Sequence, residues 1–432
     1  MIDPIILKGF RDSLPEQEIP KKKITRKLED IFSSYGFVPI DTPALEYTAV
    51  LLGKGGGETD KQIFRFTDNG GREVALRFDL TVPFARFLAA HSSTLPLPFK
   101  RYHINKVWRG ENPQKGRYRE FIQCDFDIVG VDNEEADFEI LSMMDSSFAA
   151  LGVEDYVFHV AHRGLFNSFL EHNGILDKST EILRCVDKLR KIGSDEVINQ
   201  LTEITGSLDK AKLIIKYISR DEDESFSAAI TRLENLSGGE NESSRRLKAI
   251  LSLLNECGIA DHFILDPSIT RGLDYYTGIV YETFLTKLPN IGSVCSGGRY
   301  NDLASLYTKE KLPGVGSSIG LDRLMAALEE LNSPLLADSS ASDLIIFHTK
   351  EETARAMVTA SYLRSEGLRV NVYLNPDKKM KVIFDYAEKN HIPFLLTFNE
   401  TKLVLKDLRS RETTEKADAE EIASEVIRRR SN

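Results

Sequence analysis

The chain has 432 residues, 41% of them apolar, and a formal net charge of −10. This length predicts roughly two to four domains. The acidic balance excludes a protein that coats nucleic acid nonspecifically, because neutralising phosphates requires clustered lysine and arginine. The sequence has no long apolar run and no basic leader followed by an apolar segment, so we expect neither membrane insertion nor secretion. Its four cysteines are widely spaced, which predicts reduced thiols in a cytoplasmic protein.

The first predicted element is a helix over residues 20–35. Its apolar side chains recur at helical spacing at Ile24, Leu28, Ile31 and Phe32. Gly36 ends the helix, and residues 37–43 should be extended, because each of the two prolines disfavours helical backbone in the residue before it. Farther along, residues 74–81 (VALRFDLT) predict a strand that carries Arg77, Asp79 and Thr81 to its end.

A basic segment lies between Phe99 and Arg119, where Glu111 is the single acid. Its cations are Lys100, Arg101, Lys106, Arg109, Lys115, Arg117 and Arg119. Aromatic residues and an Asn-Pro turn interrupt the charges, which favours an anion-binding hairpin. A charged, solvated face is the alternative interpretation.

The amino-acid pattern of the chain changes at two later points. Residues 165–260 are charged and free of proline, with apolar stripes that predict several helices. After a linker near Pro334, residues 342–432 contain short apolar runs that alternate with segments whose apolar residues recur at helical spacing. Alternating strands and helices predict a mainly parallel sheet covered by helices.

Four segments carry a family resemblance. They are RYHINKVWRGENPQKGRYREFIQCDFDIVG (101–130), RGLDYY (271–276), CSGGRYNDL (295–303) and GVGSSIGLDRL (314–324). Their residues and their order in the chain resemble motif 2, the two histidine signatures and motif 3 of the histidyl-tRNA synthetases. These enzymes form a family of subclass IIa within class II of the aminoacyl-tRNA synthetases. Residues 20–43 are similar to motif 1, which forms the homodimer interface in that class.

The resemblance implies an α/β fold with an α+β catalytic domain, in which helices flank an antiparallel sheet. It divides the catalytic domain into residues 1–164 and 261–331, separated by an α-helical insertion at 165–260. Residues 342–432 resemble the α/β anticodon-binding domain. The implied partners are ATP, L-histidine, tRNA(His) and a second copy of the chain, with no membrane.

The implied reaction joins histidine to ATP as histidyl-adenylate and then transfers the histidyl group to tRNA. By similarity, Arg109 contacts the α-phosphate, Arg323 lies by the adenine and γ-phosphate, and Glu111 meets the adenine edge. Arg271 bridges the histidine carboxylate and the α-phosphate as a fixed cation. The resemblance makes Arg271 and Arg109 the catalytic residues, and Mg²⁺ accompanies the ATP phosphates.

Histidine recognition is carried over onto two groups of residues. Asp79, Thr81 and Gln123 match positions that hold the α-ammonium, whereas Asp127 and Tyr276 match those that meet the ring nitrogens. Arg271 and Tyr275 complete the predicted histidine site. A neutral imidazole has one donor and one acceptor nitrogen, so a hydroxyl and a carboxylate suit it.

Three positions depart from the usual family pattern: Gly110, Asn301 and Asp322. The alternative function is a non-catalytic, histidine-sensing regulatory subunit of ATP phosphoribosyltransferase, which resembles these synthetases but generally lacks the C-terminal domain. Here the C-terminal domain and the ATP motifs are both present in the sequence. A class IIa synthetase for another amino acid is disfavoured by RGLDYY together with Asp127.

Overall fold

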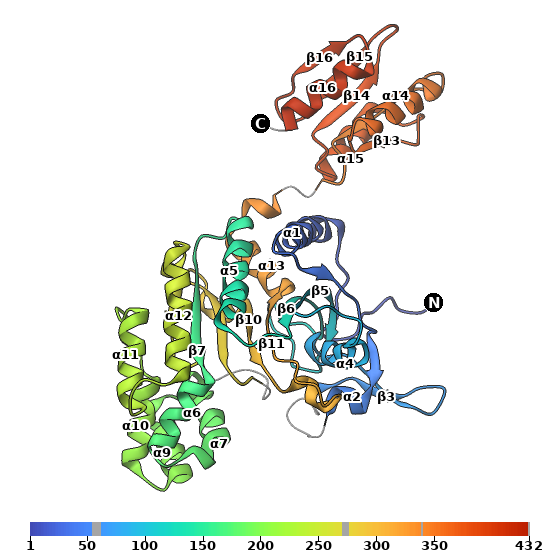
Figure 1. The fold of residues 1–432 in the computed structure, drawn as a ribbon. Helices are drawn as coiled ribbons and strands as arrows, with labels where there is room; N and C mark the ends of the chain where they lie inside the picture. Colours follow the sequence, from blue (N-terminus) through green and yellow to red (C-terminus); the bar gives the residue numbers. More distant parts are fainter. Residues whose placement is uncertain (54–61, 270–275, 338–339, 431–432) are drawn as a thin grey trace. The chain divides into compact units, whose positions relative to one another are not determined.

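The computed structural model describes residues 1–53, 62–269, 276–337 and 340–430 (Figure 1). The chain forms two compact units, one of residues 1–11 and 25–331 and the other of residues 12–24 and 332–432. Helix α1 (Pro15–Ser34) runs across this division. Within the described ranges, no helix combines the length and the apolar character needed to cross a membrane.

An eight-stranded sheet forms the centre of the first unit. Its order is β1 (Val38–Pro39), β5 (Phe99–Trp108), β6 (Glu120–Val129), β11 (Gly314–Gly320), β10 (Cys295–Tyr300), β9 (Ile279–Leu285), β7 (Tyr156–His162) and β8 (Phe263–Leu265). The neighbouring strands are antiparallel except at the two edges, where β1 with β5 and β7 with β8 are parallel. The predicted α/β class and antiparallel sheet are therefore confirmed, and the basic segment forms the β5–β6 hairpin.

The two faces of β6 have different chemistry. Cys124, Phe126 and Ile128 point to one face and are buried. There the Phe126 ring lies 4.9 Å from the ring of Phe32 on α1, measured between centroids. Residues 123, 125 and 127 alternate onto the opposite face, because successive side chains of a strand point to opposite sides. Apolar packing on one face thus fixes which polar side chains the other face presents.

Helices and a small sheet complete the first unit around this centre. Helix α5 (Glu134–Ala150) packs against β6 and β11, as does α13 (Leu321–Glu330). The small sheet has the order β2 (Leu45–Tyr47), β4 (Glu73–Leu76) and β3 (Arg65–Thr67), next to α2 (Thr48–Leu52). The strand predicted over 74–81 ends at Leu76, because Thr81 already begins α4 (Thr81–His91) and Asp79 accepts a hydrogen bond from the Val82 amide at 3.1 Å.

Seven α-helices follow β7 before the chain returns to the sheet at β8. They are α6 (Arg163–His172), α7 (Ser179–Val186), α8 (Leu189–Ile192), α9 (Ser194–Thr205), α10 (Leu208–Ile218), α11 (Phe226–Leu236) and α12 (Glu242–Glu256). Side-chain caps at Ser207, Ser225 and Asn241 satisfy the first amides of α10, α11 and α12. Helix α12 packs against α5, which connects this helical segment to the large sheet.

The second unit contains a five-stranded sheet with helices on both faces. Its order is β13 (Val370–Val372), β12 (Leu344–Ile346), β14 (Phe394–Phe398), β15 (Leu403–Asp407) and β16 (Thr413–Lys416). Apolar side chains of α14 (Thr353–Ser365) and α16 (Ala419–Arg430) cover one face, and those of α15 (Met380–Lys389) cover the other. The sheet is mixed rather than mainly parallel, because β14, β15 and β16 pair antiparallel through two successive hairpins that the sequence pattern did not predict.

All four cysteines fall within the described residues and none forms a disulfide. Cys124, Cys185 and Cys295 are buried, whereas Cys257 directly after α12 is exposed. Burial raises the pKa of the Cys124 thiol and raises that of Cys295 to about 12. The two thiols in the large sheet are therefore protonated and unreactive at neutral pH.

Replacing Phe126 by alanine should destabilise the first unit by about 3–5 kcal/mol, because the change removes a fully buried ring and leaves a cavity beside Phe32. The measurement is denaturant unfolding followed by fluorescence and circular dichroism. Phe66→Ala is the matched control, since the Phe66 side chain is 48% exposed. Equal unfolding midpoints for the two variants would contradict the assigned core.

Candidate active site

A row of acids and amides on β6 forms the base of the site. Gln123, Asp125 and Asp127 share one face of the strand, and both carboxyl groups are nearly inaccessible to water. Cross-strand register places Ser318 beside Asp125 and Gly316 beside Asp127 on β11. The Gln123 amide donates to the Ser318 hydroxyl at 2.8 Å, which fixes the orientation of this side chain.

Asp127 is held by two neighbours from other strands. Register places Arg101 of β5 opposite it, and the guanidinium forms an ion pair with Oδ2 at 2.6 Å. The Tyr300 hydroxyl of β10 donates to Oδ1. Gly316 allows this close packing, because a Cβ at that position would lie 2.0 Å from Oδ1 of Asp127. The carboxylate is therefore fixed in place before any ligand arrives.

Besides Oδ2 of Asp127, which is ion-paired with Arg101, three acceptor oxygens near these groups are buried without a hydrogen-bond partner in the described part of the chain. They are Oδ2 of Asp79, Oε1 of Gln123 and Oδ1 of Asp125. Thr81 lies in the same cluster, since its hydroxyl donates to Asp125 at 3.4 Å. Buried acceptors normally have donors. A primary ammonium carries three N–H donors, so this set suits such a group.

The carboxyl groups of this cluster are held in an unfavourable environment. Burial raises the pKa of Asp125 to about 7, and the negative charges of Asp127 and Asp79 act in the same direction while Arg101 opposes them. Burial likewise raises the pKa of Asp79 to about 6. A bound cation would relieve this cost, because an opposite charge within contact distance favours the ionised carboxylate.

A second subsite adjoins the first through Gln123. It is a cavity of about 150 Å³, lined by Arg109 and Glu111 after β5, Arg117 before β6, and Arg323 on α13 as well as by Gln123. The predicted ATP residues Arg109, Glu111 and Arg323 thus line one pocket. Three guanidinium groups around one cavity favour an anionic ligand, because each can bind two oxygens at once.

Two arginines of this pocket are held in position by backbone carbonyl groups. Arg109 Nε donates to the Phe78 carbonyl at 2.9 Å, and its guanidinium lies 5.2 Å from the centre of the Phe121 ring. Arg323 donates to the Ser293 carbonyl at 2.5 Å. Burial and the neighbouring cations lower the pKa of Arg323 to about 10, so the group stays charged at neutral pH.

The predicted histidine signature RGLDYY is described only at its last residue. Arg271 and Tyr275 lie outside the described residues. Tyr276 packs beside Tyr300, the residue that donates to Asp127. A Cβ on Gly298 would lie 2.9 Å from the Tyr276 ring, so the glycine allows the ring to approach β10 closely.

Sequence reasoning missed four residues of this site: Arg101, Arg117, Asp125 and Tyr300. Asp125 could have been found, because it alternates with Gln123 and Asp127 and so must share their face. Arg101 and Tyr300 act through Asp127, and only the strand register identifies that contact. Arg117 was counted in the basic segment but was not assigned to a site.

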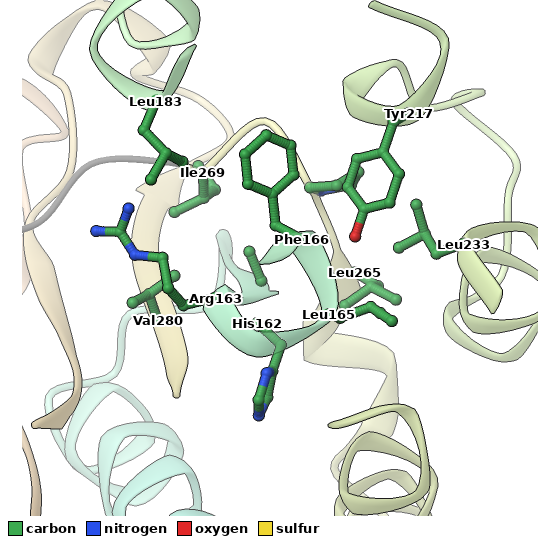
Figure 2. A pocket seen from close by; sticks show the side chains of 12 residues that line it. His162, Arg163, Leu165, Phe166, Leu183, Tyr217, Leu233, Leu265, Ile269 and Val280 are labelled. Atoms are coloured by element: carbon green, nitrogen blue, oxygen red, sulfur yellow. The ribbon is translucent and has the colours of Figure 1, made fainter. Parts of the chain in front are cut away.

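An apolar cavity elsewhere in the first unit is too small to compete with this site. It lies between the helical segment and the large sheet, and Phe166 and Tyr217 border it with rings 5.3 Å apart (Figure 2). Its volume is about 20 Å³. Such a space holds about one water molecule, and apolar cavities usually stay dry.

The chain is similar to known proteins over most of its length. A family model described as histidyl-tRNA synthetase matches residues 9–324. This chain belongs to the histidyl-tRNA synthetase family. It is 50% identical over 408 residues to the histidine–tRNA ligase of Treponema denticola, which covers 94% of this chain and 91% of that protein. A crystal structure of histidyl-tRNA synthetase from Nostoc sp. is similar with a TM-score of 0.88 at 30% identity, covering 99% of this chain and 100% of that one.

A structure described as an ATP phosphoribosyltransferase regulatory subunit/histidyl-tRNA synthetase, from Bacillus halodurans, is also similar. It is 22% identical, with a TM-score of 0.74 and coverage of 89% of this chain and 97% of that one. At this identity the likeness establishes the fold alone. The relatives at higher identity therefore favour a synthetase over the regulatory-subunit alternative.

Asp125→Asn should stabilise the free protein at high pH by about 1–4 kcal/mol and have little effect near pH 4. Burial raises the pKa of Asp125 to about 7 in the folded chain, whereas an unfolded aspartate titrates near 4. Between pH 4 and pH 7 the folded chain therefore keeps a proton on Asp125 that the unfolded chain has lost. The stability that this proton gives to the wild type decreases as the pH rises from 4 to 7, whereas the Asn variant does not lose it. Unfolding midpoints of variant and wild type at pH 5 and pH 8 measure the difference.

The control for this prediction is Asp209→Asn, which changes an exposed acid on α10. Its stability difference from wild type should be the same at both pH values. A pH-independent difference for Asp125→Asn would contradict the buried, ionisable carboxyl.

Proposed function

We propose that this protein is a histidine–tRNA ligase, which activates histidine with ATP and transfers it to the 3′ end of tRNA(His). The observation that carries the proposal is the junction of two subsites at Gln123. One offers buried acceptors for an ammonium, and the other offers three guanidinium groups for a polyphosphate. An α-amino acid placed across this junction has its carboxylate beside the nucleotide.

In the first step the histidine carboxylate attacks the α-phosphorus of ATP. A bond forms between the carboxylate oxygen and phosphorus, the bond to the β-phosphate oxygen breaks, and pyrophosphate leaves. Arg109, fixed by the Phe78 carbonyl, is proposed to offset charge on the α-phosphate, with Arg323 at the other end of the nucleotide. Arg271 is proposed to bridge the two anions, by family resemblance alone.

Histidine is proposed to be selected by its ring and its ammonium together. Asp79, Thr81 and Gln123, and now also Asp125, are proposed to receive the ammonium. Asp127 and Tyr276, with Tyr275, are proposed to meet the imidazole. Asp127 suits this role because Arg101 and Tyr300 already hold its carboxylate in place. A site built to hydrogen-bond its substrate rejects analogues without the partner groups by roughly 10⁴ to 10⁵.

Mg²⁺ is proposed to enter with the phosphates of ATP. The carboxylates that line the nucleotide pocket are Glu111 and Asp322, which are hard oxygen donors of the kind that Mg²⁺ prefers. Asp322 is already engaged by Arg11 and by the Ile122 amide at 2.7 Å. Glu111, which pairs with Arg117 at 3.6 Å, is still proposed for the adenine edge, so neither carboxylate is assigned as a ligand of the ion. The ion would neutralise phosphate charge.

Transfer to tRNA is proposed to use the two remaining parts of the chain. The helical segment from α6 to α12 is proposed to approach the acceptor arm, and the α/β unit after residue 340 to bind the anticodon loop. Both roles rest on the family resemblance and on the presence of these folded parts. A ligase that charges tRNA is proposed to act in the cytoplasm.

Amino-acid-dependent exchange of pyrophosphate into ATP tests the activation step. Histidine alone among the twenty amino acids should support exchange. Asp127→Asn should lower kcat/KM for histidine by about tenfold to a hundredfold, because a lost hydrogen bond to a charged group costs about 1.5–3 kcal/mol. Exchange that proceeds without histidine would overturn the proposed function, and unchanged histidine dependence in Asp127→Asn would overturn the ring contact alone.

A homodimer is proposed because motif 1 and strand β2, which follows it closely, carry exposed apolar side chains. Val38 is 47% exposed, Leu45 40% and Tyr47 55%. Contacts in a two-fold dimer use the same patch on both copies. Sedimentation should detect a dimer at low concentration, and Val38→Asp with Leu45→Asp should shift it towards monomer.

The matched control for the dimer is Leu374→Asp in the second unit, where the apolar side chain is 80% exposed but belongs to neither motif 1 nor β2. This variant should sediment as the wild type does. A wild-type monomer with full activity would contradict the dimer.

A further inference from the structure

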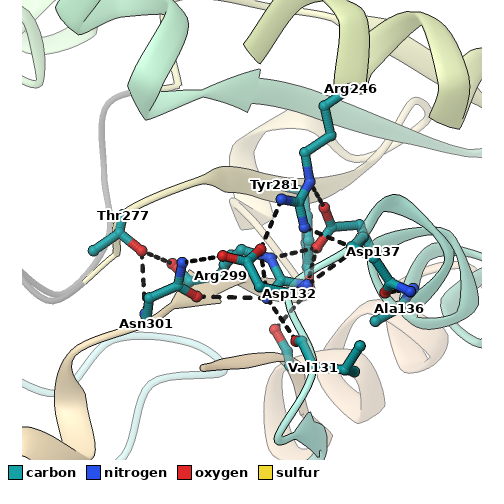
Figure 3. A network of polar contacts seen from close by, with 11 residues as sticks. Val131, Asp132, Ala136, Asp137, Arg246, Thr277, Tyr281, Arg299 and Asn301 are labelled. Atoms are coloured by element: carbon teal, nitrogen blue, oxygen red, sulfur yellow. Dashed lines mark hydrogen bonds and ion pairs between the residues drawn. The ribbon is translucent and has the colours of Figure 1, made fainter. Parts of the chain in front are cut away.

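A network of polar contacts joins four segments of the first unit beside the site (Figure 3). Arg246 on α12 donates from Nε to Asp137 Oδ2 at 2.6 Å and from a terminal nitrogen to Asp132 Oδ1 at 2.7 Å. Both acids belong to the start of α5 and the turn before it. The helical segment is thereby tied to the end of β6.

Arg299 on β10 contacts the same two acids from the sheet. Its terminal nitrogen lies 2.7 Å from Asp137 Oδ1, and another lies 3.3 Å from Asp132 Oδ1. The Arg299 side chain is 1% exposed and that of Asp137 is fully buried. A buried guanidinium between two carboxylates holds its strand rigidly, because any displacement leaves a charge uncompensated.

Asn301, two residues after Arg299, extends the network towards the histidine site. Its side-chain amide donates to Asp132 Oδ2 at 2.8 Å, and its backbone N–H donates to the Thr277 hydroxyl at 3.1 Å. The Thr277 amide donates to the Arg299 carbonyl at 2.7 Å. Thr277 directly follows Tyr276, which packs against Tyr300. The contacts therefore lead from α12 to a proposed ring-binding residue.

The contacts of the network favour a neutral side chain at position 301, because its amide nitrogen donates to Asp132 while its oxygen accepts from Arg299 at 3.5 Å. Burial alone would raise the pKa of Asp132, but Arg246 and Arg299 hold it below its usual range, so the carboxylate is ionised. The Asn301 amide occupies the remaining oxygen of that carboxylate. A carboxylate at position 301 would meet Asp132 at contact distance and repel it.

We propose that Asn301 is a positioning residue for histidine: held by Asp132, it fixes Thr277 and so sets the place of Tyr276. Arg246 and Arg299 orient Asp132 for this task. The inference rests on the proposed function, because the ligand positioned by Tyr276 is histidine. If Asn301 has this role, Arg246 of α12 also affects histidine binding, although its side chain lies outside both subsites.

The test is steady-state pyrophosphate exchange on the full-length protein, with the KM for histidine and the KM for ATP measured separately. Asn301→Asp should raise the histidine KM by about tenfold and leave the ATP KM unchanged. Asp132→Asn in the same chain should restore the histidine KM to within about threefold of wild type, because the amide donor and the carboxylate acceptor then exchange places.

Arg246→Ala should also raise the histidine KM selectively, whereas Lys248→Ala on the same helix should not. Lys248 pairs with Glu234 and Glu240 inside the helical segment and has no described contact with the network. Should Asn301→Asp fail to fold, Asn301→Ala removes the contact to Asp132 without adding a charge, and the same selective rise is expected.

The outcomes separate the inference from the function on which it rests. A wild-type protein that shows no histidine-dependent pyrophosphate exchange would contradict the proposed function. Wild-type exchange with an unchanged histidine KM in Asn301→Asp, an equal rise in both KM values, or no restoration by Asp132→Asn would overturn the positioning role alone. A purely structural role predicts the equal rise together with a lower unfolding midpoint.

Discussion

The ion pair between Arg101 and Asp127 is the interaction on which the site depends. Both side chains are almost completely buried, and the guanidinium also lies 4.1 Å from the centre of the Phe84 ring. Removing either partner would leave a buried charge uncompensated, which costs about 3–5 kcal/mol. Because the pair joins β5 to β6 and Tyr300 adds β10, the register of three strands and the placement of the acidic subsite are fixed together.

The two subsites carry side chains of opposite charge. Carboxyl groups collect on β6 and at the start of α4, while guanidinium groups collect around the cavity formed by the hairpin ends and α13. Each subsite alone is electrostatically unfavourable, because it gathers charges that are mainly of one sign. Under the proposed function, a zwitterionic amino acid beside a polyphosphate would satisfy both. Part of the binding free energy of these substrates would then come from relief of the repulsions.

Sequence reasoning predicted the parts of this protein that depend on local patterns. The α1 stripe, the β5–β6 hairpin and the charged arginines follow from periodicity and composition, and the family motifs supplied Asp79 and Asp127. Contacts set by register were not accessible, since nothing in the spacing of Arg101 and Tyr300 indicates that both bind Asp127. The early end of β4 was missed for a similar reason: Asp79 accepts a hydrogen bond from the Val82 amide in the first turn of α4, and nothing in an alternating run of residues indicates that contact.

The distribution of thiols gives the helical segment a natural reporter position. Cys257 is exposed directly after α12, while Cys124, Cys185 and Cys295 are buried in cores. A maleimide dye added to the unmodified protein should therefore couple to a single place, without removing any native cysteine. Because α12 carries Arg246 at the start of the Asp132 network, the fluorescence anisotropy of that dye would follow in real time how tightly the helical segment is held as ligands bind.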